Sequence, residues 1–195
     1  MKKLFWGIFF IYLNFNLDLS GHQLNLLPDF VGYILLILGM QDLAGESAFF
    51  KKAKPFAIGM TVYSALVWVG ALLGFAMEGV MFELLSLAAL LVSLYISWLL
   101  ICGILEMEAQ QEADWGGKTL RSRWKLLLGV QIANRVLSLA ATFSDLSILY
   151  VLVAAVSIAG MVCIILYLLA WYRLWNAYGA KAGEKNEETT ENNEQ

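Results

Sequence analysis

The chain has 195 residues, of which 60% are hydrophobic and 15% charged, and its mean hydropathy is +0.68. Soluble domains have a smaller apolar share and a larger charged share, so this composition excludes a soluble globular protein and indicates a polytopic membrane protein. The formal net charge is −3, and no nucleic acid partner is expected.

Six apolar stretches follow one another along the chain. We predict helices at about 4–18, 28–43, 54–77, 80–110, 119–143 and 146–177. The last four contain nearly uncharged runs long enough to cross about 30 Å of hydrocarbon, for which a helix needs roughly 20 residues. The predicted fold class is all-α: a single transmembrane helical domain, residues 1–178, with four full spans and an N-terminal pair of short helices.

The first two stretches are too short for ordinary spans. Leu4–Leu17 and Phe30–Gln41 contain fourteen and twelve uncharged residues. They form either two short spans or a hairpin that enters and leaves from the cytoplasm, and both arrangements thread the rest of the chain identically. Pro28 suits the first turn of the second helix, and the Asp29 carboxylate is favourable near that N-terminus.

The block Leu26–Leu35 contains Leu-Pro-Asp-Phe at residues 27–30, continues with an aliphatic residue and glycine, and follows a short polar connector. Here the chain resembles a set of uncharacterised small bacterial polytopic inner-membrane proteins that carry such an LPDF-type block near the N-terminus. The resemblance covers about the first 45 residues. It implies a multi-pass protein of the bacterial plasma (inner) membrane and carries no known activity.

The basic residues lie on one side of the predicted membrane. With the N-terminus inside, twelve of the thirteen Lys and Arg fall in the cytoplasm. The outer connections contain no Lys or Arg but carry Asp18, His22, Asp29, Glu78, Glu83 and Asp145. This positive-inside pattern places both termini in the cytoplasm. The lipid bilayer is the expected partner, and we expect its anionic headgroups to contact Lys118, Arg121, Arg123 and Lys125.

The thirteenth basic residue, Arg135, lies in the middle of the 19-residue window Leu126–Ser144, which has no other charge. A charge near the bilayer midplane costs about 3 kcal/mol on insertion scales unless it is paired, hydrated or able to snorkel. The sequence therefore predicts either a partner or a polar site for Arg135.

The polar residues of this window predict which face Arg135 occupies. Gln131, Arg135, Ser138 and Thr142 recur at spacings of four, three and four, and Asn134 flanks them. By rise per residue, Asn14 lies at nearly the depth of Arg135, and Asp18 lies one turn further out. We predict an outward-facing polar pocket with Arg135 at its floor, Asn14 and Asp18 on one wall, and Glu83 or Asp29 nearer its mouth.

Two functions remain open for such a pocket. The first is binding or translocation of a small anionic or zwitterionic solute, with Arg135 as counter-charge. The second is a non-transporting accessory, scaffold or sensory role, in which Arg135 is a structural ion pair. A membrane enzyme is the third reading, since the sequence contains no catalytic, cofactor or metal motif.

Two further features concern assembly and the C-terminus. The pattern Gly70-x-x-x-Gly74 fits close helix packing, within the chain or in a homo-oligomer. Residues 179–195 are rich in Glu, Asn and Lys and contain no large apolar side chain. Because such a segment buries little surface, we expect a disordered acidic cytoplasmic tail.

Overall fold

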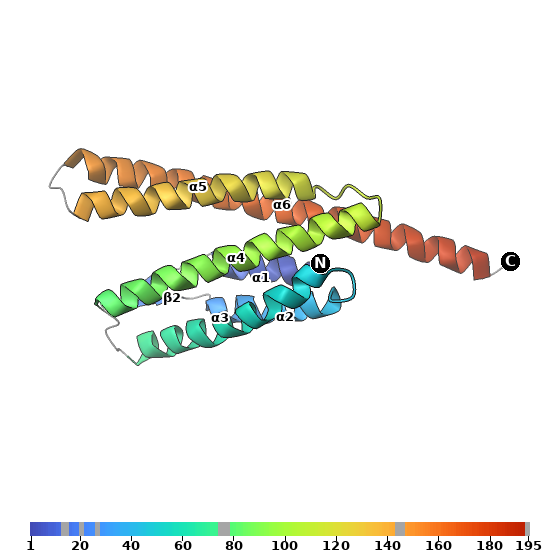
Figure 1. Ribbon diagram of the computed structural model, residues 1–195, viewed down its shortest axis with the longest axis horizontal. Coiled ribbons are helices and arrows are strands. Elements are labelled where there is room, and N and C mark those ends of the chain that lie inside the picture. Colours follow the sequence, from blue (N-terminus) through green and yellow to red (C-terminus); the bar gives the residue numbers. More distant parts are fainter. Residues whose placement is uncertain (13–15, 20–21, 26–27, 74–78, 143–146, 194–195) are drawn as a thin grey trace. The chain divides into compact units, whose positions relative to one another are not determined.

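The computed structural model describes residues 1–12, 16–19, 22–25, 28–73, 79–142 and 147–193, without the side chains of 16–19, 22–25, 80, 83, 142, 147 and 182–193. The elements are α1 (Lys2–Tyr12), β1 (Asn16–Leu19), β2 (His22–Asn25), α2 (Asp29–Asp42), α3 (Ala48–Leu72), α4 (Val80–Gln110), α5 (Gly117–Thr142) and α6 (Ser147–Asn193) (Figure 1). The predicted all-α class is confirmed, since two four-residue strands are the only non-helical elements in the described ranges.

The chain forms two compact units, Met1–Ala113 and Asp114–Gln195, where the sequence had suggested one helical domain. Unit 1 contains α1 to α4, and each helix packs against the next in the sequence. Unit 2 is the helical hairpin of α5 and α6.

A β-hairpin connects α1 to α2 in unit 1. Strands β1 and β2 pair in antiparallel fashion, with Asn16 opposite Asn25 and Leu19 opposite His22. The predicted first helix, about 4–18, is corrected: α1 ends at Tyr12, and residues 16–18 belong to β1 because their backbone pairs with β2. A two-residue link between strands is typical of a tight hairpin.

Glycines allow α1 and α2 to approach closely. A Cβ atom added at Gly32 would lie 2.7 Å from Ile11 Cγ1 and 2.8 Å from the carbonyl oxygen of Gly7. A Cβ atom at Gly39 would lie 2.7 Å from a methyl group of Leu4. Contacts this short leave no room for a side chain, so the helix pair depends on glycine at these positions.

Aromatic and aliphatic side chains fill the rest of unit 1. The Phe50 ring of α3 packs against Gly103 of α4, where an added Cβ atom would lie 2.8 Å from the ring. Leu4, Leu36, Phe50 and Met107 are almost fully buried. The hydroxyls of Tyr12 on α1 and Ser97 on α4 form a hydrogen bond of 3.3 Å.

Polar contacts join the helix ends of unit 1. The hydroxyl of Ser47 accepts a hydrogen bond of 3.1 Å from Phe49 N–H at the start of α3 and donates one to Glu106 of α4. Lys3 and Asp42 form an ion pair of 2.8 Å. Burial lowers the pKa of the adjacent Met1 amino group, and the Asp42 carboxylate opposes this effect.

Three helices are long and apolar enough to cross a membrane, within Ala48–Leu72, Leu84–Gln110 and Ile148–Lys181. Many of their apolar side chains are exposed, including Val62, Leu91 and Ile158. These are the helices of a membrane protein. The expectation of four full spans is corrected to three among the described residues. The reason is that Gln131, Asn134 and Arg135 interrupt the apolar run of α5 before the described helix ends at Thr142.

Two predicted helix boundaries also differ. The third helix begins at Ala48, not near residue 54, because Ser47 caps it and Pro55 is accommodated inside the helix. The sixth continues to Asn193, past the predicted end near 177. Residues 180–188 are mostly Ala, Glu and Lys, which favour helix even where little surface is buried. The backbone of 179–193 continues α6 as a helix, and the disorder expected of this tail stays a prediction.

Candidate functional site

The predicted pocket combines residues from both units, and the structure describes only some of them. Asn14 lies outside the described residues, and so do the side chains of Asp18, in β1, and Glu83, in α4. Asp29 is the first residue of α2, directly after its N-cap Pro28, and is partly exposed. The assembly of these four residues around Arg135 remains a prediction.

The other predicted residues lie on α5 in unit 2, whose inner face follows a heptad-like repeat. Buried or half-buried positions recur at alternating spacings of four and three, namely Leu120, Trp124, Leu127, Gln131, Asn134, Ser138 and Ala141. We call this set the seam. On α6 the same spacing connects Val153, Val156, Gly160, Cys163, Tyr167, Ala170 and Leu174. Such a pattern packs two helices along their length.

Contacts along the hairpin fix the antiparallel register. Trp115 and Tyr178 pack edge to face with ring centroids 5.1 Å apart. A Cβ atom at Gly160 would lie 3.6 Å from Val130. Near the turn, the Tyr150 hydroxyl donates a hydrogen bond of 3.4 Å to the carbonyl oxygen of Ala141.

The middle of the seam is polar. Gln131, Asn134 and Ser138 are half-buried on α5. The Ser157 hydroxyl on α6 donates a hydrogen bond of 3.2 Å to Asn134 Oδ1. The structure thus brings these three residues to one face, as the sequence indicated, although Asn134 belongs to the seam itself and does not merely flank it.

Arg135 lies one position outside the seam and is exposed in unit 2. Its neighbours on the same side of α5 are apolar and exposed: Ile132, Val136 at 61% and Leu139 at 62%. Within the described residues of unit 2, the guanidinium has no hydrogen-bond or ion-pair partner. The predicted stripe therefore divides: Gln131 and Ser138 join the seam, and Arg135 faces outward from the hairpin.

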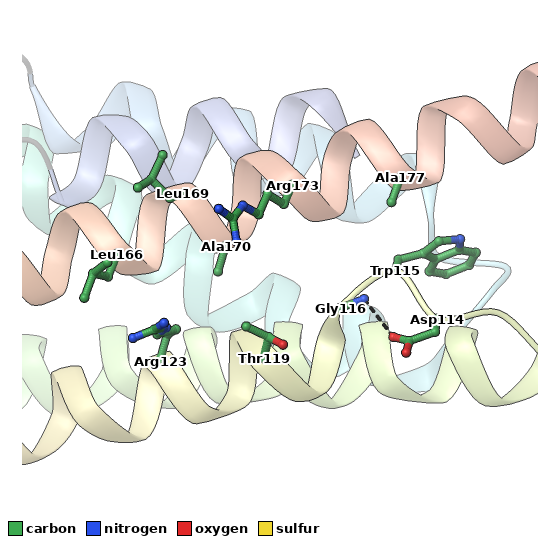
Figure 2. Close-up of a pocket in the computed structure, with 10 residues that line it drawn as sticks. All are labelled: Asp114, Trp115, Gly116, Thr119, Arg123, Leu166, Leu169, Ala170, Arg173 and Ala177. Atoms are coloured by element: carbon green, nitrogen blue, oxygen red, sulfur yellow. Dashed lines mark hydrogen bonds between the residues drawn. The ribbon is translucent and has the colours of Figure 1, made fainter.

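A groove that the sequence analysis did not predict lies between the N-terminal half of α5 and the middle of α6 (Figure 2). Its volume is about 440 Å³. Thr119 and Arg123, one turn apart on α5, line one side, and Arg173 lines the other. Leu166, Leu169 and Ala170 of α6 provide the apolar part of the lining.

The loop before α5 closes one end of the groove. Asp114, Trp115 and Gly116 line it there, opposite Ala177. Gly116 has a φ of +97°, a conformation that glycine adopts without strain. Its N–H donates a hydrogen bond of 3.1 Å to Asp114 Oδ1, so this carboxylate interacts with the N-terminus of α5.

The groove contains one basic residue that the sequence analysis had used only to orient the chain, namely Arg173. Finding it from sequence requires the register between the two helices, because Arg123 and Arg173 are fifty residues apart. The spacing of Leu166, Ala170 and Arg173 on one helical face was the available signal.

Comparisons with protein families, curated proteins and solved structures give no match for this chain. The resemblance of its N-terminal block therefore stays a prediction.

Proposed function

We propose that the protein binds or translocates a small anionic or zwitterionic solute in the membrane, with Arg135 as the counter-charge. The observation that carries this proposal is the position of Arg135: it is exposed on the hairpin, in the C-terminal half of α5 and in the middle of the window Leu126–Ser144, beside the polar part of the seam that contains the Asn134–Ser157 hydrogen bond. Ionisable side chains at such depth usually serve substrate pathways, proton relays or ligand counter-ions.

The location belongs to the same proposal. The one-sided distribution of Lys and Arg supports a multi-pass protein of the bacterial plasma (inner) membrane with both termini in the cytoplasm. This threading requires α5 to cross the membrane together with α6, in addition to the three helices that are apolar enough to cross by themselves. The LPDF-type block supports a bacterial source. In this orientation, the pocket proposed from Arg135, Asn14, Asp18, Asp29 and Glu83 opens to the outside.

One observation favours the alternative, a non-transporting accessory, scaffold or sensory protein. Arg135 lies on an otherwise apolar exposed face with Ile132, Val136 and Leu139, and a charge on such a face is stable in the membrane when a carboxylate of an adjoining helix pairs with it. In that case Arg135 is a structural ion pair with a carboxylate. Removing the guanidinium should abolish solute binding under the first function, and should break an ion pair with a carboxylate under the second.

The test is ligand-dependent thermal stabilisation of the full-length protein in neutral detergent. Glutamate, succinate, glycine and betaine serve as anionic and zwitterionic probes. We expect at least one probe to raise the Tm in a saturable manner, because binding to the folded state stabilises it. Arg135→Leu should abolish that shift, Arg135→Lys should keep part of it, and Lys125→Leu, which removes a charge from the same helix, should keep all of it.

Two outcomes would contradict the solute-binding proposal. In the first, a probe stabilises Arg135→Leu as strongly as the wild-type protein. In the second, no probe acts and a double-mutant cycle couples Arg135 to Asp18, Asp29 or Glu83 by about 1 kcal/mol or more, as expected for a structural ion pair. The cycle uses Arg135→Leu with Asp→Asn or Glu→Gln.

A further inference from the structure

The groove of unit 2 lies where both of its helices change from apolar to basic sequence. On α6 the charge-free run of residues 146–172 ends at Arg173. On α5 the basic stretch that contains Arg123 ends at Lys125, directly before the apolar window Leu126–Ser144. Both arginines of the groove therefore belong at the boundary between hydrocarbon and headgroups.

The lining separates into a basic and an apolar part. Arg123 and Arg173 line the groove from different helices, and Thr119 adds a hydroxyl one turn before Arg123 (Figure 2). Guanidinium groups bind phosphate oxygens through paired N–H donors, which gives geometric selectivity as well as charge. Leu166 and Leu169 continue the lining toward the apolar part of α6, and Leu169 is 47% exposed.

The charges favour an anion. Asp114 is the one acidic residue of the lining, and its Oδ1 already accepts the Gly116 N–H. The lining therefore contains two cationic groups and one carboxylate, and that carboxylate is already hydrogen-bonded to the backbone. A small soluble anion would use the arginines but not the leucines, whereas a phospholipid would use both.

We propose that this groove binds an anionic glycerophospholipid. Arg123 and Arg173 hold the phosphate, the Thr119 hydroxyl donates to one of its oxygens, and an acyl chain lies along Leu166 and Leu169. This site differs from general attraction of headgroups to the basic stretch, because Lys118 and Lys125 do not line the groove. It is also independent of Arg135 and of any solute bound there.

The experiment is titration of the purified full-length protein in neutral detergent with phosphatidylglycerol, phosphatidylcholine or glycerol 3-phosphate, with bound lipid counted by native mass spectrometry. We expect phosphatidylglycerol to bind at least about tenfold more tightly than the other two, since only it combines negative charge with acyl chains. Raising the salt concentration should weaken this binding.

The variants separate the groove from the basic stretch. Arg123→Gln and Arg173→Gln should each weaken phosphatidylglycerol binding about fivefold to tenfold, and Arg173→Lys about twofold to threefold, because it keeps the charge but loses the paired donors. Lys125→Gln is the matched control and should change binding less than about twofold. Both arginines are exposed, so the variants should fold, which thermal unfolding without added lipid verifies.

Three results would overturn the proposal. Equal binding of phosphatidylglycerol and phosphatidylcholine would remove the role of the arginines. Equal competition by glycerol 3-phosphate would indicate a soluble phosphate ligand in place of a lipid. An equal loss of phosphatidylglycerol binding in Lys125→Gln and Arg173→Gln would show that binding depends on the overall positive charge of the surface and not on the groove.

Discussion

The helix pair α1–α2 in unit 1 and the helix pair α5–α6 in unit 2 are held together in different ways. Between α1 and α2 the backbones meet at Gly7 and Gly32, with no space for an added methyl group. Between α5 and α6 side chains interlock along a seam, and polar groups occupy its middle. The first pair should fail when atoms are added, and the second when atoms are removed.

The difference indicates where a ligand can be accommodated. Where two membrane helices approach closely through glycines, their backbones leave no space between them for a ligand. A seam with Asn134, Gln131 and Ser138 at its centre provides hydrogen-bonding groups beside the exposed Arg135. Unit 2 also contains the groove of Arg123 and Arg173. Both proposed sites therefore depend on the hairpin.

The largest expected effect comes from overpacking the α1–α2 contact. Gly32→Ala places a methyl group 2.8 Å from the Gly7 carbonyl oxygen and 2.7 Å from Ile11, so we expect a loss of about 2–3 kcal/mol in unfolding free energy, measured by denaturation in mixed micelles. Gly59→Ala is the matched control, because an added Cβ atom there meets nothing within 4 Å on α3. That control should be neutral or slightly stabilising. Equal losses in both variants would refute the role of close packing.

The converse change should weaken the seam. Leu127→Ala removes a fully buried side chain of α5 and should cost about 1–2 kcal/mol in the same assay. The loss stays modest because lipid tails solvate leucine as well as a protein core does, leaving mainly lost packing. Leu126→Ala, at a half-exposed neighbour, should cost much less. A larger effect at Leu126 would mean that the seam is misassigned.

Ser47, at the N-terminus of α3, makes two polar contacts within unit 1 that substitutions can separate. Ser47→Ala removes both the cap of α3 and the hydrogen bond to Glu106, and we expect a loss of about 1 kcal/mol. Ser47→Asp keeps a capping oxygen but places a second carboxylate beside Glu106. If capping dominates, thermal unfolding will rank Asp above Ala, and if the contact with Glu106 dominates, it will rank Asp below Ala.

The smallest expected effect concerns the polar centre of the seam. Ser157→Ala removes the hydrogen bond to Asn134 and should cost about 0.6 kcal/mol, the typical value for such bonds between membrane helices. Asn134→Leu with Ser157→Ala should recover that loss, since both polar partners are then absent. A loss well above 2 kcal/mol in Ser157→Ala would show that the seam depends on this bond more than on packing.

The sequence predicted the existence, order and type of all six helices. Long apolar runs separated by charged connectors are sufficient for this prediction, because a helix needs a minimum length of apolar sequence to cross a bilayer. It did not predict the strands β1 and β2, although Leu17, Asp18 and Leu19 alternate in polarity before Ser20-Gly21, a pattern typical of a hairpin. The short length of the segment concealed the alternation.

The candidate site was predicted only in part, for a geometric reason. Steps of four and three group Gln131, Arg135 and Ser138, whereas steps of three and four group Gln131, Asn134 and Ser138, and both average 3.5 residues. The buried positions earlier on α5 fix the phase that selects Asn134. A single position separates the two assignments, and it moves Arg135 to the exposed side. The groove was not predicted from the sequence, because Arg123 and Arg173 become neighbours only through the register of the hairpin.

If Arg135 is the counter-charge for a solute, it must face a polar, water-accessible site in the membrane. Arg135→Cys in a background without Cys102 and Cys163 tests it by reaction with an impermeant, charged thiol reagent added to intact cells. Gln23→Cys, in the predicted outer connector, is the reference for labelling from outside, and Val136→Cys is the matched apolar neighbour on α5.

We predict that Arg135→Cys reacts with the reagent from outside. Val136→Cys should react at least about tenfold more slowly, since a thiol in hydrocarbon does not ionise readily. A solute probe that stabilises the wild-type protein should not change the reaction rate of Arg135→Cys, because this variant lacks the guanidinium that binds the probe. If Gln23→Cys is labelled while Arg135→Cys reacts as slowly as Val136→Cys, the site faces lipid or protein, and the proposed pocket around Arg135 does not exist.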